Sequence, residues 1–247
     1  TINTQPALFV TSIAILRVLQ QESPMAKPAW VAGHSMGELT ALTAAGAISF
    51  EDGVKLVRTR GRLMQQAGDE SPGAMAALLA LDSDKVNELC ASVSEETGKI
   101  VVLANDNCPG QIVVSGENEA IDRIIEVAPD AGARRAVKLA VSIAAHSPLM
   151  ASASESFVEA LAATNISEPQ IPVYGNVTAA PLKTASEIRE ELNHQLTRSV
   201  LWTDSMQGII TAGAETFVEI GSKDVLSGLM KRIDRKKARV SLNSVEA

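Results

Sequence analysis

Residues 29–46 decide the fold: Ala29-Trp-Val-Ala-Gly33-His34-Ser35-Met36-Gly37-Glu38-Leu-Thr-Ala-Leu-Thr-Ala-Ala-Gly46. A short apolar strand runs through the pattern G-x-S-x-G into a helix rich in alanine and leucine, which predicts a nucleophile elbow. The turn of such an elbow is sharp, so we expect no room for side chains at Gly33 and Gly37. Ser35 then lies at a helix N-terminus, where the unpaired N–H of Met36 can stabilise an oxyanion.

The composition is that of a globular protein and disfavours several classes of function. The chain has 247 residues, 46% of them hydrophobic and 21% charged, which is long enough for one large domain or two smaller ones. A net charge of −7 argues against nonspecific binding of nucleic acid. The longest apolar runs, such as residues 74–81, fall well short of the ~18 residues that suggest a membrane span. We therefore expect neither nucleic acid nor a membrane as a partner.

The N-terminus and the cysteines bear on the cellular compartment. Thr1-Ile-Asn-Thr-Gln-Pro6 contains neither the basic nor the apolar region of a secretory signal and no initiator Met. We therefore expect a cytoplasmic protein, and a chain that begins inside a longer one. Cys90 and Cys108 are too few for a disulfide framework or a zinc site, so we expect free thiols and no bound metal.

The order of the predicted elements indicates an α/β fold with an inserted subdomain. Two turn-rich segments, residues 68–73 and 144–148, bound a distinct region. Within it the pattern predicts a strand at 74–81, a helix at 83–96, a strand at 100–105, a turn at 107–110, a strand at 111–115, a helix at 117–128 and a strand at 134–141. This β-α-β-β-α-β order is ferredoxin-like. We predict a small subdomain of residues 71–143 inserted into a large one of residues 1–70 and 144–247.

Strands and helices alternate in the predicted large subdomain. Helices are expected at residues 4–20 and 50–66, on either side of the elbow, and later at 149–163, 185–196, 204–212 and 225–233, with strands at 171–174 and 216–219. This alternation predicts a mostly parallel sheet that is covered on both faces.

A serine nucleophile needs a base, and the chain has three histidines. Alternation along the strand points His34 away from the side of Ser35, and His194 lies at a charged helix end. His146 lies in the loop where the chain returns to the large subdomain, so we predict that it is the base. The acidic residues between Ser35 and His146 lie mostly in the insert, so we expect a dyad rather than a triad.

Basic residues offer a second kind of candidate. Arg60, 25 residues after Ser35 and placed near the end of the next predicted helix, is either a helix C-terminal cation or a guanidinium that binds a substrate carboxylate. Two local clusters are either solvated faces or a docking surface for an acidic partner; they are Arg134, Arg135 and Lys138, and Lys231, Arg232, Arg235, Lys236 and Lys237.

Six motifs are spread over nearly the whole chain: Thr4-Gln-Pro-Ala-Leu8, Gly33-His-Ser-Met-Gly-Glu38, Arg60-Gly-Arg-Leu-Met-Gln65, Asn107-Cys-Pro-Gly-Gln111, Ala145-His-Ser-Pro-Leu-Met150 and Val200-Leu-Trp202. Together they resemble the bacterial malonyl-CoA:acyl carrier protein transacylases. The resemblance implies an α/β-hydrolase-like large subdomain with a ferredoxin-like insert. It also implies malonyl-CoA and acyl carrier protein as partners in fatty-acid biosynthesis, with no cofactor.

The same resemblance implies roles for individual residues. Ser35 is the nucleophile, His146 the base, and Arg60 takes the position that binds the malonyl carboxylate. Gln195 takes the position whose backbone carbonyl orients the histidine. Residues implied near the pantetheine channel are Asn107, Gln111 and Arg135, and those implied to receive the acidic carrier protein are Lys231 and Arg232.

Two departures from the family pattern leave alternatives open. The family begins with a strand and a Gly-Gln-Gly loop whose glutamine contributes to the oxyanion hole, and this chain starts after both. Gly221-Ser-Lys-Asp224 replaces the family's usual Gly-Pro-Gly-Lys. A serine esterase or thioesterase, a fragment without catalytic activity that serves in interactions, and a polyketide-synthase acyltransferase domain remain as alternatives.

Overall fold

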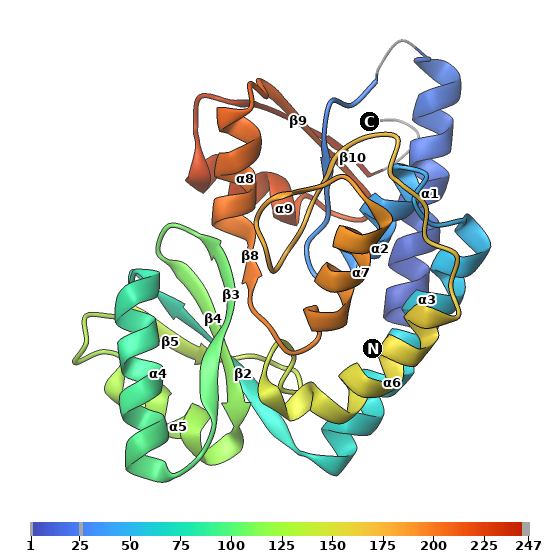
Figure 1. The fold of residues 1–247 in the computed structure, drawn as a ribbon. Coiled ribbons are helices and arrows are strands. Elements are labelled where there is room, and N and C mark those ends of the chain that lie inside the picture. Colours follow the sequence, from blue (N-terminus) through green and yellow to red (C-terminus); the bar gives the residue numbers. More distant parts are fainter. Residues whose placement is uncertain (1, 25–26, 244–247) are drawn as a thin grey trace.

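The predicted elbow connects a short strand to a helix. In the computed structural model, which describes residues 2–24 and 27–243, strand β1 (Val31–Ala32) leads through Ser35 into helix α2 (Gly37–Ala44) (Figure 1). Ser35 has a φ of +53°, a left-handed conformation that is uncommon for a residue with a side chain. This strained turn is typical of a nucleophile elbow.

The two glycines of the elbow differ in their surroundings. A Cβ atom on Gly33 would lie 1.9 Å from the carbonyl oxygen of Gly37, so the turn excludes any side chain there. A Cβ atom on Gly37 would meet no atom of the described residues within 4 Å. The expectation is therefore confirmed for Gly33 and wrong for Gly37, which lines an open groove instead of the inside of the turn.

This difference predicts opposite outcomes for two alanine substitutions. We expect Gly33→Ala to lower the free energy of unfolding by about 1–3 kcal/mol or more, because the new methyl group meets rigid backbone. Gly37→Ala should change it by less than about 1 kcal/mol, since helix propensity favours alanine. Thermal unfolding of the two variants, followed by circular dichroism, checks this. Equal losses of stability would contradict the structural assignment of Gly33.

The helices outside residues 71–143 agree with the predicted ones to within a few residues. Capping explains two of their starts: Ser49 accepts a hydrogen bond from the N–H of Asp52, and Thr184 forms a capping box with Glu187. The helices are α1 (Thr4–Glu22), α3 (Phe50–Glu70), α6 (Ala151–Ala162), α7 (Ala185–His194), α8 (Trp202–Thr211) and α9 (Val225–Ile233), and a 3-10 turn, η1 (Pro148–Met150), precedes α6.

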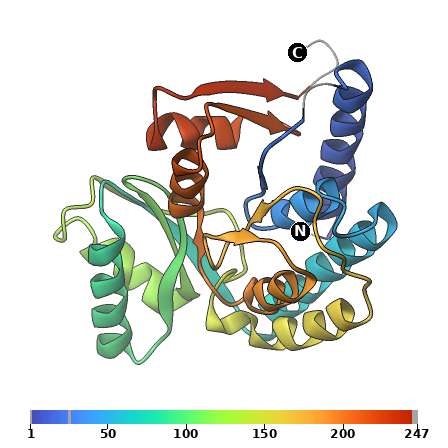
Figure 2. The same ribbon diagram turned by 45° about the horizontal axis from the view of Figure 1, so that its top comes forward.

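Outside residues 71–143, all strands but one short strand form two separate sheets rather than one. Strand β6 (Val173–Tyr174) pairs in parallel with β1 and antiparallel with β7 (Pro181–Leu182). Strands β9 (Thr216–Ile220) and β10 (Ala238–Leu242) form a parallel pair beyond the C-terminal end of α8 (Figure 2). An apolar groove of about 600 Å³ between β1 and β9 is lined by α1, α2 and α8. The predicted parallel pairing is present, while β7 and β10 were not expected.

Residues 73–138 form a compact α/β unit. Its elements are β2 (Gly73–Leu79), α4 (Ser83–Thr97), β3 (Val101–Cys108), β4 (Gln111–Glu117), α5 (Asn118–Val127) and β5 (Arg135–Lys138). The strand order is β5-β2-β4-β3, every neighbouring pair is antiparallel, and α4 and α5 cover one face (Figure 1). This is the predicted ferredoxin-like arrangement.

Two details of this unit differ from expectation. Strand β3 continues to Cys108, so the predicted turn at 107–110 is reduced to Pro109 and Gly110, because two register shifts let the bulged strand keep its pairing with β4. Strand β8 (Val200–Leu201), which was not predicted, pairs in parallel with β3. A strand from the C-terminal half thus extends the four-stranded sheet, and the subdomain limits at residues 71 and 143 stay a prediction.

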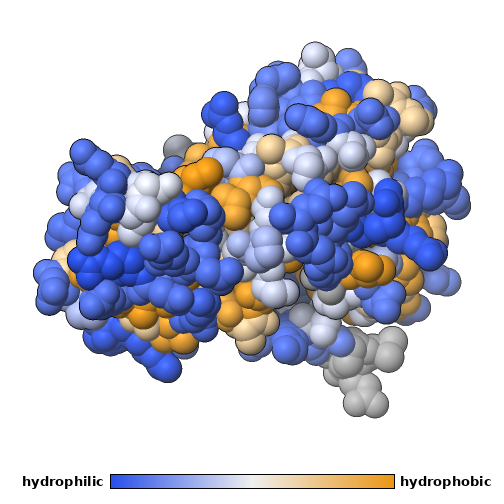
Figure 3. Space-filling model, turned by 90° about the horizontal axis from the view of Figure 1, so that it is seen from below, coloured by the Kyte–Doolittle hydropathy of each residue, from blue (hydrophilic) through white to orange (hydrophobic). Residues whose placement is uncertain are grey.

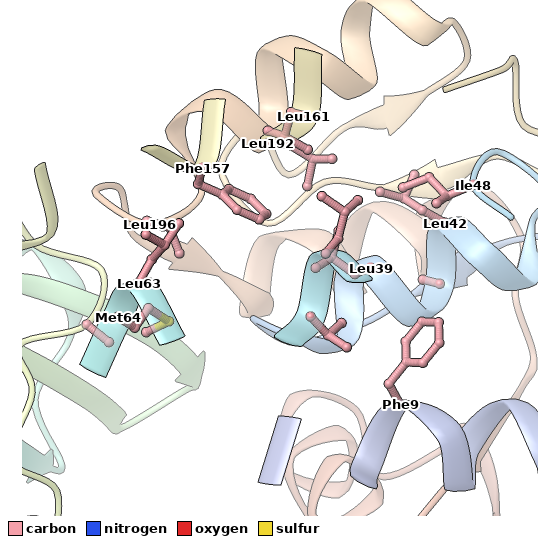
Figure 4. Close-up of a cluster of buried hydrophobic side chains, with 14 of the residues drawn as sticks. Phe9, Leu39, Leu42, Ile48, Leu63, Met64, Phe157, Leu161, Leu192 and Leu196 are labelled. Atoms are coloured by element: carbon pink, nitrogen blue, oxygen red, sulfur yellow. The ribbon is translucent and has the colours of Figure 1, made fainter. Parts of the chain in front are cut away.

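The core lies mainly between helices. Helices α1, α2, α3, α6 and α7 contribute to the largest buried cluster, and the side chains of Phe9, Leu39 and Phe157 are almost completely buried there (Figure 4). Burying such a side chain contributes about 1.5–3 kcal/mol. A second cluster fills the space between α4, α5 and the four-stranded sheet.

The surface is mostly polar. On the face seen in Figure 3, hydrophilic residues predominate and hydrophobic ones occupy small separate areas. Within the described part of the chain, no helix combines the length and apolar character needed to cross a membrane.

Candidate active site

Ser35 and His146 meet at the junction of the elbow and the loop before α6. The Oγ atom of Ser35 lies 2.8 Å from Nε2 of His146, although the two residues are 111 positions apart. His146 has a φ of +57° and is 3% exposed. Its other ring nitrogen, Nδ1, lies 2.9 Å from the carbonyl oxygen of Gln195 and 3.1 Å from that of Arg198. The histidine is therefore held from one side and faces the serine with the other.

These contacts determine where the imidazole proton resides. Carbonyl oxygens only accept hydrogen bonds, so Nδ1 of His146 carries the proton and donates it. Nε2 is then unprotonated and accepts from the hydroxyl of Ser35. A serine bonded to the free nitrogen of an oriented imidazole is a nucleophile paired with its base.

Burial keeps this histidine neutral. Burial first, and then the positive charges of Arg60 and His34, lower the pKa of His146 to about 3, against the opposing effect of the two carbonyl acceptors. At neutral pH the imidazole is therefore available to take a proton.

Arg60 lies beside the same hydroxyl. Its Nη2 donates to Ser35 Oγ at 3.0 Å, its Nη1 to the side chain of Gln5 at 2.9 Å, and its Nε to the side chain of Gln195 at 2.9 Å. Helix α3 continues to Glu70, so Arg60 is not near a helix C-terminus, and that interpretation is wrong. Burial lowers its pKa to about 10, so the guanidinium keeps its charge at neutral pH. Two of its five N–H groups remain for a ligand.

The elbow also offers a donor for an oxyanion. Among the described residues, the N–H of Met36 has no hydrogen-bond acceptor, and it lies directly before the first turn of α2. The dipole of α2 adds partial positive charge at this point. The predicted donor is therefore free and adjacent to Ser35.

His34 has a different environment from His146. Its Nε2 lies 2.7 Å from the side-chain oxygen of Asn107, and its ring packs edge-on against Trp202. Burial lowers the pKa of His34. His194, the third histidine, is exposed beside Glu190. Asn107, which the sequence resemblance places near a pantetheine channel, is thus paired with His34.

The remaining predicted site residues lie farther along the small sheet and on α9. Arg232 donates to the side chain of Gln111 at 2.6 Å and to the carbonyl oxygens of Pro109 and Gly110, so it joins α9 to the β3–β4 turn. Lys231 is exposed in the last turn of α9, and Arg135 is exposed at the start of β5. The structure therefore brings Gln111 and Arg232 together, and it places Arg135 on the other side of β2, where Arg135 and Gln111 both lie opposite Leu79 in the sheet register.

Sequence reasoning missed the buried polar groups beneath the elbow. The carboxylate of Glu38 accepts from Gln195 Nε2 at 2.6 Å, and Gln195 also donates to the carbonyl of Ser35. Burial, followed by the nearby charge of Glu191, raises the pKa of Glu38 well above its usual range. Gln5 and Asn176 are buried here as well. The only signal in the sequence is that Glu38 directly follows the elbow.

Both cysteines lie in the interior of the protein. Cys90 and Cys108 are buried and free, as predicted, and burial raises the pKa of Cys90 to about 12. Over residues 2–24 and 27–243, no group of three or more His, Cys, Asp or Glu side chains is placed to hold a metal ion.

A serine on a strained strand-to-helix turn, bonded to a neutral histidine and adjacent to a free helix N–H, is the arrangement of enzymes that form a covalent ester on serine. Residues 1–243 match the family model described as an acyl transferase domain, and the chain belongs to this family.

Several relatives are similar to this chain over its whole length. The chain is 42% identical to the malonyl CoA-acyl carrier protein transacylase of Bacillus subtilis, covering 100% of this chain and 77% of that protein. It is 40% identical to the protein of that name from Escherichia coli, with 100% and 79% covered. The crystal structure of an acyl carrier protein S-malonyltransferase from Vibrio cholerae superposes with a TM-score of 0.95 at 39% identity, covering 100% of this chain and 79% of that one.

One similar structure contains a bound partner. It shows a type II PKS acyl-carrier protein in complex with its malonyl-transacylase, and it matches with a TM-score of 0.95 and 39% identity over 100% of this chain and 79% of that chain.

Proposed function

We propose that this protein transfers the malonyl group of malonyl-CoA to the phosphopantetheine thiol of acyl carrier protein in fatty-acid biosynthesis, through a malonyl ester on Ser35. The observation that carries this proposal is the position of Ser35 Oγ, 2.8 Å from His146 Nε2 and 3.0 Å from Arg60 Nη2, in a chain of the acyl transferase family. Relatives named for this activity, at 40–42% identity, support it.

The first half of the reaction forms the acyl-enzyme. His146 takes the hydroxyl proton on Nε2 while Ser35 Oγ forms a bond to the thioester carbonyl carbon. The N–H of Met36 stabilises the oxyanion of the tetrahedral intermediate. The carbon–sulfur bond then breaks, and the CoA thiolate leaves with the proton that His146 returns.

The second half repeats these steps with the carrier thiol. His146 takes the thiol proton, the sulfur attacks the malonyl ester, and the released oxygen of Ser35 recovers the proton. Every proton in the cycle passes through His146; the first leaving group is the thiolate of CoA, and the second is the oxygen of Ser35, which regenerates the free enzyme. The proposed reaction therefore uses malonyl-CoA as a substrate and no separate cofactor, and we place it in the cytoplasm, together with its two soluble substrates.

Arg60 provides the preference for a malonyl group in this proposal. Its guanidinium is fixed by Gln5 and Gln195, and its two spare N–H groups suit a carboxylate. Binding the free carboxylate there places the ester carbonyl at Ser35 and fixes the acyl chain for attack by the incoming thiol.

The pKa of His146 predicts the pH dependence of malonyl loading. The imidazole must be neutral to act as base, so a pKa of about 3 keeps it active as the pH falls through 6.5, its ordinary value. We expect kcat/KM for acyl-enzyme formation to stay level from about pH 8 to about pH 5. The unfolded chain binds the proton near pH 6.5 while the folded chain does not, so stability declines below that pH, and circular dichroism must accompany the rates. A loss of activity with a midpoint between pH 6 and 7, in protein that remains folded, would contradict the environment described for His146.

Charge on α9 is the proposed docking feature for the acidic carrier protein. Lys231 is exposed and its side chain has no hydrogen bond to any residue that the structure describes, whereas Arg232 holds the β3–β4 turn. We expect Lys231→Glu to raise KM for the carrier protein several-fold at low salt, with a smaller effect at high salt, because steering by exposed charge is screened. Loading from malonyl-CoA should be nearly unchanged. Lys85→Glu, the same change at an exposed lysine of α4, is the matched control. An equal rise in KM for both variants would show that net charge acts instead of a surface on α9.

A further inference from the structure

The side chain of Asn176 spans the inside of the elbow. Asn176 follows β6, is 1% exposed, and is far from Ser35 in sequence. Its Nδ2 donates to the carbonyl oxygen of Gly33 at 2.8 Å, and its Oδ1 accepts from the N–H of Ser35 at 2.6 Å. One amide group therefore satisfies a backbone acceptor and a backbone donor two residues apart, on the two sides of His34.

The backbone of Asn176 is held just as firmly. Its N–H donates to Oε1 of Glu38 at 2.9 Å, and its carbonyl accepts from the N–H of Leu201 at 2.7 Å. The carboxylate of Glu191, on α7, accepts from the backbone of Val177 and from both the N–H and the hydroxyl of Thr178. Glu38 and Glu191 are themselves buried, so this loop is fixed between α2 and α7.

These contacts connect the loop to the catalytic groups. Glu38 accepts from Gln195 through its second carboxylate oxygen, and the side-chain oxygen of Gln195 accepts from Arg60. The carbonyl of Gln195 holds His146. A left-handed conformation at a serine persists only where the surroundings over-determine it. The side chain of Asn176 binds the N–H of the strained serine itself and the carbonyl of Gly33 two residues earlier.

We propose that Asn176 is a positioning residue, which holds the elbow in the conformation that presents Ser35 Oγ to His146. Because Oδ1 occupies the N–H of Ser35, the N–H of Met36 is the elbow donor that remains for the oxyanion. This inference rests on the proposed acyl transfer. Asn176 acts through Ser35 and does not contact the malonyl group.

Three variants test the proposal. Asn176→Ala removes both contacts with the elbow. Asn176→Asp keeps the acceptor for Ser35 and donates to Gly33 only while the new carboxyl group is protonated. Ser205→Ala is the matched control, because the buried hydroxyl of Ser205 donates to the carbonyl of Gly175, next to Asn176, but does not contact the elbow. Rapid-quench measurement of malonyl loading gives kcat and KM for each, alongside thermal unfolding.

We expect Asn176→Ala to lower the maximal loading rate roughly 100-fold with little change in KM for malonyl-CoA, because a small displacement of the nucleophile affects the chemical step. Ser205→Ala should load at a rate close to that of the unaltered protein, although we expect it to lose about as much stability as Asn176→Ala. For Asn176→Asp, the loading rate relative to the unaltered protein should increase as the pH is lowered. This readout remains if Asn176→Ala fails to fold, and a mere loss of packing does not produce it.

Two results would overturn the proposal. One is Asn176→Ala loading as fast as Ser205→Ala. The other is Asn176→Asp with a loading rate that stays in constant proportion to that of the unaltered protein at every pH. Failure of the proposed function is a separate outcome, because the unaltered protein would then either form no malonyl-enzyme in the same assay or lose its malonyl group as free malonate with and without carrier protein.

Discussion

The Ser35→Ala variant is expected to form no malonyl-enzyme when it is mixed with malonyl-CoA. Ser35 is the hydroxyl placed on the elbow, 2.8 Å from an unprotonated histidine nitrogen, and alanine offers no atom that can bond to the acyl group. Loss of the covalent route typically leaves only the contribution of binding and of the oxyanion donor. Intact-mass analysis after brief incubation measures the adduct directly.

Ser115→Ala is a suitable control for this experiment. Ser115 is completely buried, and its hydroxyl has no hydrogen-bond partner among the described residues, so its removal should cost little stability and no activity. This control should gain the mass of one malonyl group as the unaltered protein does. A malonyl adduct that survives in Ser35→Ala would show that another side chain is the nucleophile.

Arg60→Ala should lose malonyl transfer by far more than acetyl transfer. The guanidinium contacts Ser35 Oγ, so its removal affects both acyl groups, but only malonyl has a carboxylate that can pair with it. A buried charge-assisted contact of about 2–4 kcal/mol changes the ratio of the two rates roughly 30- to 1,000-fold. The ratio therefore separates carboxylate binding from the general effect on the serine.

Arg62→Ala is the matched control for Arg60→Ala. Arg62 lies on the same helix but is exposed, so its removal should leave both transfer rates and their ratio unchanged. Equal losses of malonyl and acetyl transfer in Arg60→Ala would mean that Arg60 supports the serine without selecting the substrate.

The sequence predicted the parts of the fold that depend on local patterns. The G-x-S-x-G turn, the long amphipathic helices and the β-α-β-β-α-β order each have a period or a turn signal within a few residues. Strands β7 and β8 were missed because each contains two residues, too few to show alternation. Strand β10 comes directly after a basic segment and contains only five residues. Its pattern alone therefore did not identify it, and its pairing with β9 is visible only in the structure.

The site was predictable where one residue stands out and not where many side chains cooperate. Ser35 was identified by its motif and His146 by comparing three histidines. The position of Arg60 within α3, fully buried beside the serine, depends on how α3 packs against the elbow. Asn176 gave no signal, and Glu38 gave only its position directly after the elbow, since their importance arises from hydrogen bonds that only the folded chain brings together.

Arg232 illustrates the limit for surface charge. The sequence shows a basic cluster, and either a solvated face or a docking surface is compatible with it. The structure adds that Arg232 is engaged by Gln111 and by the β3–β4 turn, while Lys231 is not. Two adjacent basic residues thus have different surroundings, which no pattern of charge along the chain distinguishes.

A single-turnover transfer measures directly whether the malonyl group moves from Ser35 to the carrier thiol. The protein is loaded with malonyl-CoA, separated from free CoA, and mixed with carrier protein bearing the phosphopantetheine thiol, and the mass of both proteins is followed over time. We expect the malonyl group to disappear from the Ser35 peptide at the rate at which it appears on the carrier, and to remain on Ser35 when the carrier is absent. Release of free malonate at the same rate with and without carrier would contradict this expectation and identify a hydrolase.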